Sequence, residues 1–267
     1  MSGGKKAKRA RRRLAAWTTF VVLLALLLVG GWLVTGAGGS KDDPPAGNDA
    51  YVELVDITLS TDDDRDTYLV DMQAVADHAA LGRDVIYADA FDGNPRAHVR
   101  WRVHRSFRRL PAFYHGNPDL IDSYLQGQGR ALAPRLQALV ASRAVRAGTP
   151  LGATLLLAAD LCAQQRTVGL GCRVFIFTDG EFIGEGIDSR RPIPASAQRA
   201  WLDAWAPRLG GLAGARVSFV GVGYGTGDDS GLDDARSIAA TVIAKAGGTM
   251  PSGDAGWAVR VSPGALG

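Results

Sequence analysis

Residues 51–60 read YVELVDITLS, an apolar run of strand length that ends in alternating polar side chains. Side chains point to opposite faces of a strand in turn, so residues spaced by two share a face. Asp56, Thr58 and Ser60 therefore leave the strand on one side, while Ile57 and Leu59 turn to the other. We predict a buried strand whose carboxyl end presents three oxygen-bearing side chains.

Working outward from this stretch, short apolar runs alternate with longer helical patterns, which is typical of a parallel sheet covered on both faces. The turn 91–95, FDGNP, has hairpin composition and predicts one antiparallel edge strand. The fold class is α/β, a doubly wound and mostly parallel sheet. Expected strands lie at 51–57, 84–90, 97–103, 173–177, 215–222 and 257–261, and expected helices at 63–78, twice within 118–145, and at 151–164, 194–205 and 233–246.

The amino-terminal part predicts a membrane anchor. Seven cations lie within residues 5–13, and Leu14–Thr35 contains no ionisable side chain. About 20 apolar residues cross a bilayer core, so 14–35 is long enough for one transmembrane helix. The competing interpretation is a secretory signal cleaved after Ala37. The positive-inside rule makes 1–13 a cytoplasmic tail and places the rest, a linker at 36–50 and one domain at 51–261, outside the cytoplasm.

Within that domain, residues 105–148 form a helical insertion, and 262–267 form a tail. The insertion carries Phe107, Phe113 and Tyr114, which are expected either to contact a partner or to pack in the core.

The charge of the outer part argues against nucleic acid as a partner. The whole chain has 30 basic and 27 acidic residues, but seven of the cations belong to the anchor and no acid precedes Lys41. The outer part is therefore acidic, whereas phosphate-binding domains carry a basic excess. Arginine far outnumbers lysine among these cations, and Ala and Gly are abundant, which indicates a GC-rich bacterial genome.

Two cysteines, Cys162 and Cys172, both lie in the outer part, where disulfides persist. Cys162 falls late in an expected helix and Cys172 opens the following strand, so a bridge is feasible. Two buried thiols are the alternative.

Three segments place polar oxygens where strands end or helices begin: 56–60, 148–152 and 177–181. Ligands of doubly wound sheets bind outside the carboxyl ends of the strands. The expected ligands for one cation are two carboxylates and three hydroxyls, and this all-oxygen set is typical of Mg²⁺, with Mn²⁺ or Ca²⁺ possible. They are Asp56, Thr58, Ser60, Thr149 and Asp179.

These residues resemble those of a von Willebrand factor type A (VWA) domain with a metal-ion-dependent adhesion site (MIDAS). Asp56, Thr58 and Ser60 match the family motif D-x-S-x-S with Thr in place of the first Ser, while Thr149 and Asp179 match its later threonine and aspartate. Residues 217–223 resemble the penultimate strand of that family, and residues 238–249 resemble its last helix and turn. The resemblance implies a Mg²⁺ ion that leaves one position for the Asp or Glu carboxylate of a protein ligand, and a binding module without enzymatic activity.

Simpler roles compete at each position. Asp56, Ser60, Thr61 and Thr149 suit local caps, and Asp179-Gly180 suits a turn. The glycine-rich residues 221–227 lack the step into a helix of a dinucleotide site, and Glu181 and Glu185 are expected to be solvated loop acids. Two other functions stay open: a metal-dependent hydrolase or phosphotransferase that uses Asp56 as nucleophile, although Thr58 stands where a second acid is usual, and a structural envelope domain stabilised by its metal.

Overall fold

The computed structural model describes residues 45–221, 230–252 and 256–266. One compact unit holds Pro45–Arg109 and Ser123–Gly267, and Leu110–Asp122 belongs to a second one. The predicted tail 1–13, membrane segment 14–35 and most of the linker lie outside the described residues, as do positions 222–227 of the glycine-rich loop. Among the residues described, no helix has the length and apolar character needed to cross a membrane.

The larger unit is built on a six-stranded sheet in the order β3-β2-β1-β4-β7-β8. All neighbouring strands are parallel except β2 and β3, which are antiparallel, as the sequence predicted for one edge. The chain moves from β1 to β2 on one side and later to β4 on the other, so the topological switch lies between β1 and β4. The strands are β1 Asp49–Asp56, β2 Val85–Phe91, β3 Val103–Ser106, β4 Gly171–Phe177, β7 Arg216–Val220 and β8 Trp257–Ala258, and a separate hairpin joins β5 Ile183–Gly184 to β6 Ile187–Asp188.

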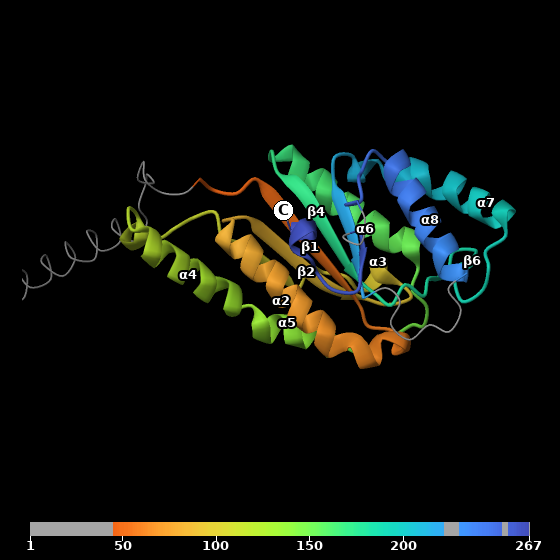
Figure 1. Cartoon of the computed structure of the whole chain (residues 1–267), viewed down its shortest axis with the longest axis horizontal. Helices are drawn as coiled ribbons and strands as arrows, with labels where there is room; N and C mark the ends of the chain where they lie inside the picture. The colour runs from red at the N-terminus through yellow and green to blue at the C-terminus, as the bar shows by residue number, and fades with distance from the viewer. Residues whose placement is uncertain (1–44, 222–229, 253–255, 267) are drawn as a thin grey trace, which may run out of the picture. The chain divides into compact units, whose positions relative to one another are not determined.

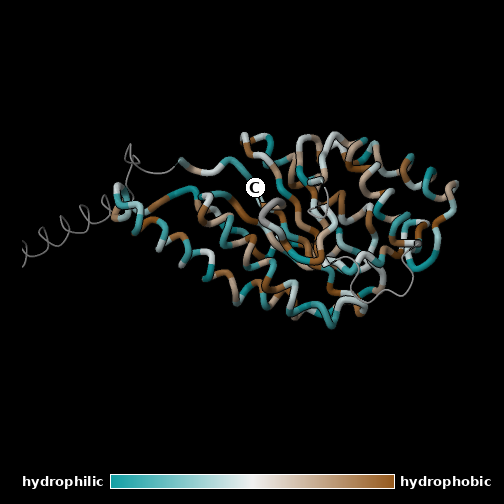
Figure 2. Tube along the Cα trace, in the orientation of Figure 1, coloured by the Kyte–Doolittle hydropathy of each residue, from teal (hydrophilic) through white to brown (hydrophobic). Residues whose placement is uncertain are grey.

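Helices cover both faces of this sheet (Figure 1), with α2 and α5 on one side and α6, α7 and α8 on the other. The hydrophobic colour follows the central strands, whereas the helices alternate between the two colours (Figure 2). The α-helices are α2 Arg65–Leu81, α3 Pro95–His98, α4 Pro118–Arg130, α5 Ala133–Val140, α6 Leu151–Thr167, α7 Ala195–Trp205, α8 Ser230–Lys245 and α9 Pro263–Leu266, and the 3₁₀ helices are η1 Leu59–Asp64, η2 Ala112–Tyr114, η3 Ala206–Arg208 and η4 Gly210–Leu212.

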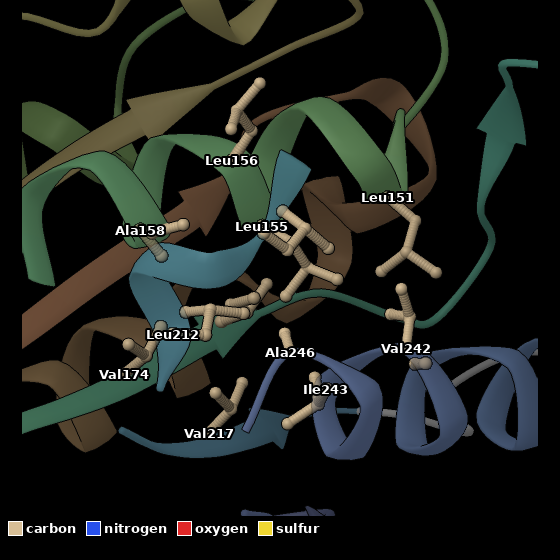
Figure 3. Packing of buried hydrophobic residues seen from close by; sticks show 14 of the residues in the cluster. Leu151, Leu155, Leu156, Ala158, Val174, Leu212, Val217, Val242, Ile243 and Ala246 are labelled. Carbon is tan, nitrogen blue, oxygen red and sulfur yellow. The ribbon is translucent and has the colours of Figure 1, made fainter. Parts of the chain in front are cut away.

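The main core lies between the sheet and the second helix group. Figure 3 shows Leu151 of α6 turned toward Val242 of α8 and Leu155 of α6 turned toward Ile243 of α8, and Val174 of β4 belongs to the same cluster. All five side chains are at most 1% exposed. Full burial of an aliphatic side chain stabilises the fold by about 1.5–3 kcal/mol, so this packing holds α6 in place. The helix in turn fixes the position of Thr149, just before its first turn.

A disulfide joins Cys162 of α6 to Cys172 of β4, with 5.5 Å between the two Cα atoms. The feasible bridge is thus formed, and the alternative of two thiols is excluded. The bridge closes a short loop and is expected to stabilise the fold by roughly 2–3 kcal/mol. It ties the helix that begins at the candidate site to the strand that ends there.

One predicted strand was wrong. Residues 97–103 were expected to pair with 84–90, but Pro95–His98 form α3, and the antiparallel strand starts only at Val103. Asn94 and Pro95 start the helix, since proline suits a first turn. The buried Asp89 then accepts hydrogen bonds from the backbone N–H groups of Arg100 (2.6 Å) and Arg102 (3.2 Å), which bends the chain before β3.

Several domain boundaries also differ from expectation. The first strand begins at Asp49, inside the expected linker, because the Asp49 N–H is held by the Asp84 carboxylate at 3.0 Å. The expected insertion includes the last two residues of β3, and Phe107 is buried rather than presented to a partner. The expected tail folds into α9, whose Leu266 carbonyl accepts a hydrogen bond from Arg173 at 2.9 Å. In the smaller unit Phe113 is exposed and contacts Tyr114 edge to face.

Candidate metal-ion site

The five predicted site residues come from three places at one edge of the sheet. Asp56 ends β1, and Thr58 and Ser60 follow it in the turn into η1. Thr149 stands two residues before α6, and Asp179 two residues after β4. The ends of β1 and β4 flank the topological switch, where open α/β sheets bind their ligands. The structure therefore assembles residues that lie more than 100 positions apart in the sequence.

Asp56 is the centre of the hydrogen-bond network. Its Oδ1 accepts the backbone N–H of Thr58 at 2.9 Å. Its Oδ2 accepts the hydroxyl of Thr149 at 2.7 Å and that of Thr178 at 3.1 Å. Asp56 is completely buried, and burial raises the pKa of its carboxyl to about 6, although the hydrogen bonds from Thr58 and Thr149 lower that pKa. The network holds a carboxyl in one orientation at the strand end.

Thr58 and Ser60 bring their hydroxyl oxygens within 3.3 Å of each other, as their spacing predicted. The turn is fixed by Thr61, whose hydroxyl donates to the carbonyls of Asp56 (3.0 Å) and Thr58 (2.9 Å). Arg65 adds a 2.7 Å bond to the carbonyl of Ile57. Ser60 is exposed while Thr58 is buried, so the pair spans the boundary between the core and solvent.

Thr149 does not cap α6, the simpler role considered for it. Its hydroxyl is bonded to Asp56, and Pro150 occupies the N-cap position. The preceding Gly148 has φ +92°, and a Cβ atom there would lie 2.9 Å from the carbonyl oxygen of Ile183. Glycine alone adopts that conformation without strain and permits this approach. The carbonyl of Thr149 then accepts the N–H of Ile183 at 3.2 Å, which fastens this segment to the chain beyond β4.

Asp179 forms the local turn considered for it. Its Oδ1 accepts the N–H of Glu181 at 2.9 Å, a local turn bond of the kind expected for Asp-Gly. Its carboxylate is also buried and close enough to Asp56 that its negative charge contributes to the raised pKa of that residue. The turn thus aims a second carboxyl at the same region.

The chemistry of these residues fits a hard divalent cation. Asp56 and Asp179 are both buried, and within the described part of the chain neither forms an ion pair. A buried negative charge without a counter-charge is costly, and a cation would offset that cost. No cluster of three or more His, Cys, Asp or Glu side chains suited to a metal occurs in residues 45–221, 230–252 or 256–266. Hydroxyl oxygens would therefore have to complete the shell, as Mg²⁺ chemistry allows.

A pocket of about 660 Å³ lies beside the hydroxyl-bearing residues. Thr58, Ser60 and Thr149 lie in its wall, so a cation held by them could be reached from solvent. The rest of the wall mixes apolar and charged side chains from the segments after β1, before α6 and after β4. These further lining residues include Leu59, Asp62, Arg65, Arg143, Val145, Arg146, Glu181, Ile183 and Arg190.

Sequence reasoning missed three side chains of this region. Thr178 donates its hydroxyl to Asp56, because Ile176 pairs with Leu54 and two residues later Thr178 stands beside Asp56, a register that only the structure shows. Asp92, just after β2, holds the loop before Gly148 by accepting the N–H groups of Val145 (2.7 Å) and Arg146 (3.0 Å). No local sequence signal indicates that contact.

The third is Glu185, which was wrongly expected to be solvated. Its two carboxylate oxygens accept the N–H groups of Gly152 (2.7 Å) and Ala153 (2.8 Å) at the start of α6. These N–H groups have no partner within the helix, and a carboxylate at this end also suits the helix dipole. Glu185 therefore secures the helix that carries Thr149 at its entrance.

No protein-family model matches this chain, and no curated protein matches it significantly. Several solved structures are distantly similar. The SpaC pilus adhesin of Lactobacillus rhamnosus GG, in its open conformation, is 10% identical with a TM-score of 0.40 over 80% of this chain and 28% of its own. A mutant of the PilB minor pilin from Streptococcus sanguinis is 12% identical with a TM-score of 0.43, over 79% and 57%. A von Willebrand factor type A protein from Catenulispora acidiphila is 11% identical with a TM-score of 0.30, over 74% and 43%.

This chain thus spans between 28% and 57% of the length of these three structures. With TM-scores below 0.5 these likenesses carry no functional weight, and the function proposed below rests on the residues of the site.

Proposed function

We propose that this protein is a VWA-type binding module that recognises a protein ligand through a carboxylate bridged by Mg²⁺. The observation that carries the proposal is the network around Asp56, in which a fully buried carboxyl is oriented by Thr149 and Thr178 from two other segments beside an open pocket. Thr58, Ser60 and Thr149 would hold the ion with their hydroxyls, and Asp56 and Asp179 would supply negative charge. Mn²⁺ or Ca²⁺ could replace Mg²⁺ in such an oxygen site.

The ion would supply a residual positive charge facing the pocket. Neutral hydroxyls neutralise little of a divalent charge, so an external Asp or Glu carboxylate gains a favourable contact. The chain itself keeps the hydroxyls in place. Thr61 and Arg65 hold the turn by hydrogen bonds to its carbonyls, and Gly148 adopts the positive φ that positions Thr149. Binding, without a chemical step, is what this arrangement supports.

We place the module outside the cytoplasm on a membrane anchor at residues 14–35. The disulfide between Cys162 and Cys172 supports this location, because such bonds persist in oxidising compartments. The cation-rich residues 5–13 would remain cytoplasmic.

A catalytic role for Asp56 has no support in the geometry. A nucleophile must reach its substrate, yet Asp56 is completely buried and both its oxygens accept hydrogen bonds. A metal that only stabilises the fold is the remaining alternative, and the experiment must separate it from ligand binding.

The proposal is tested by calorimetric titration of Mg²⁺ into the purified 267-residue chain in mild detergent, followed by capture of envelope proteins with and without chelator. We expect Mg²⁺ binding that Ser60→Ala weakens and Asp66→Asn, an exposed acid on α2, leaves unchanged. No binding of Mg²⁺, Mn²⁺ or Ca²⁺ would overturn the proposal. Metal binding that raises the melting temperature without any metal-dependent partner would favour the structural role, and turnover of a phosphate ester that depends on Asp56 would favour a hydrolase.

A further inference from the structure

Two of the four arginines in the pocket wall make no ion pair within the described part of the chain. Arg65 pairs with Asp62 at 2.5 Å, and Arg190 holds both carboxylate oxygens of Asp188, at 2.9 and 3.0 Å. Arg143 and Arg146 are exposed, and neither guanidinium makes an ion pair with any residue in the described ranges. Both belong to the segment Arg143–Ala147, which we term the arginine loop.

The backbone of the arginine loop is held firmly. The Asp92 carboxylate accepts two of its N–H groups, those of Val145 and Arg146, and the Gly93 N–H donates to the Arg146 carbonyl at 3.1 Å. A Cβ atom at position 93 would lie 2.1 Å from the carbonyl oxygen of Ala147, so glycine is needed for this close approach. The loop therefore presents its arginines from a fixed backbone, which reduces the entropy lost when a ligand binds.

Exposed apolar side chains lie in the same wall. Leu59, between the two site hydroxyls, is 83% exposed, and Val145, between the two arginines, is 73% exposed. Aliphatic side chains that reach into solvent beside a pocket, with charged residues around them, are typical of a protein contact. A small inorganic anion would leave both of them uncovered.

Two acids also line the pocket. Asp62 is paired with Arg65 at 2.5 Å, so the exposed charges that remain for a ligand include those of the arginine loop and of Glu181. An acidic ligand group would be attracted by the arginines and repelled by Glu181.

The geometry points to a partner segment with two acidic residues two positions apart. We propose that one carboxylate meets the Mg²⁺ ion and the second meets Arg143 and Arg146, because side chains spaced by two share a face of an extended segment. Arg146 precedes the site residue Thr149 by three positions, so their Cα atoms are at most about 10–11 Å apart, and one short extended segment can reach both. This inference rests on the proposed function and specifies its ligand.

The test uses blocked synthetic peptides and the purified chain with Mg²⁺, followed by NMR titration. One peptide carries Glu-Leu-Gly at its centre, a second Glu-Leu-Glu and a third Glu-Leu-Lys. We expect the second to bind roughly fivefold more tightly than the first, as two exposed charge contacts allow, and the third to bind more weakly than the first.

In the double variant Arg143→Ala/Arg146→Ala this preference for the second peptide should vanish, while Mg²⁺ affinity and binding of the first peptide stay unchanged. Arg199→Ala, which removes the same charge from an exposed arginine on α7 outside the pocket, is the matched control and should keep the preference.

The outcomes separate this inference from the function on which it rests. If peptides bind only with Mg²⁺ but with equal affinity, or if the double variant keeps the preference, the second acid is refuted and the Mg²⁺ bridge stands. If no peptide binding depends on Mg²⁺, both fail. Inorganic phosphate is added last. If it displaces the Glu-Leu-Glu peptide at a concentration well below that of the peptide, the arginines bind a phosphorylated ligand, and the proposal of an acidic peptide partner is wrong.

Discussion

Two acids on β1 lie three residues apart and are both completely buried, yet their surroundings are opposite. Asp56 accepts hydrogen bonds from the Thr58 N–H and from the hydroxyls of Thr149 and Thr178. Glu53, in the middle of the sheet, has no hydrogen-bond partner for either carboxylate oxygen within the described structure. Burial raises the pKa of Glu53 well above its ordinary value, with no charged neighbour contributing. The difference is that burial alone raises the pKa of Glu53, whereas hydrogen-bond donors from several segments surround Asp56, as the proposed cation site requires.

Removing the carboxyl of Asp56 should have the largest effect of these changes. Asp56→Ala deletes a charge at the centre of the site and leaves the buried hydroxyls of Thr149 and Thr178 without their acceptor. We expect Mg²⁺ affinity to fall more than about 100-fold, a loss near 2.7 kcal/mol, measured by calorimetry. Should this variant unfold, Ser60→Ala tests the same site from its exposed edge, where a loss of less than about threefold would contradict the proposed ion position.

Glu53→Gln sharpens the comparison from the other side, because Gln imitates the protonated acid. The folded-state pKa of Glu53 is raised, so the wild-type chain is most stable relative to the variant at low pH. It loses stability as the pH rises above the unfolded value near 4.3 until the folded-state pKa is passed. The variant should therefore gain up to about 1.4 kcal/mol per pH unit over that window, visible as a higher melting temperature at pH 7 than wild type.

The matched control is Asp66→Asn, which removes the same charge from an exposed position on α2. A gain of equal size for this control, or a Glu53→Gln gain that does not change with pH, would show that Glu53 is not a neutral core acid.

Thr178→Val tests whether donors outside the predicted set matter to Asp56. The change keeps the shape of the side chain but removes one of the hydroxyls that orient Asp56. Loss of such an orienting contact typically reduces metal affinity about 10-fold or somewhat more, and we expect that result by calorimetry. Thr178→Ser retains the hydroxyl and should bind Mg²⁺ within about threefold of wild type. Equal affinities of the valine and serine variants would contradict the role given to Thr178.

Glu185 is intermediate between the two acids, being half-buried with two backbone donors. Glu185→Ala should lower the free energy of unfolding by about 1 kcal/mol, the usual value of a lost helix cap, as measured by chemical denaturation. Glu181→Ala, in the same loop but without a helix contact, should cost less than about 0.5 kcal/mol. Similar losses in the two variants would mean that the cap does not stabilise α6.

Much of the fold follows from local pattern. Apolar runs of strand length separated by helical periodicity predicted the parallel sheet and its antiparallel edge, since these patterns need no knowledge of distant residues. The strand predicted at 97–103 was wrong because of a contact that local pattern does not reveal. The Asp89 carboxylate accepts the backbone N–H groups of Arg100 and Arg102, so β3 begins only after them. The two helices predicted within 118–145 were confirmed, and the break between them falls at residues 131 and 132, just before Pro134.

The sequence by itself determined which oxygen-bearing side chains could form a site and on which side of β1 they leave the strand, because alternation along a strand is a local rule. The tertiary structure alone decided that Asp56 receives hydroxyls from residues 93 and 122 positions away. It also decided that Glu185 caps α6, and that Asp92 fixes the arginine loop beside the pocket. These contacts join segments far apart in the chain, and only the packing of α6 against β4 and the core brings them together.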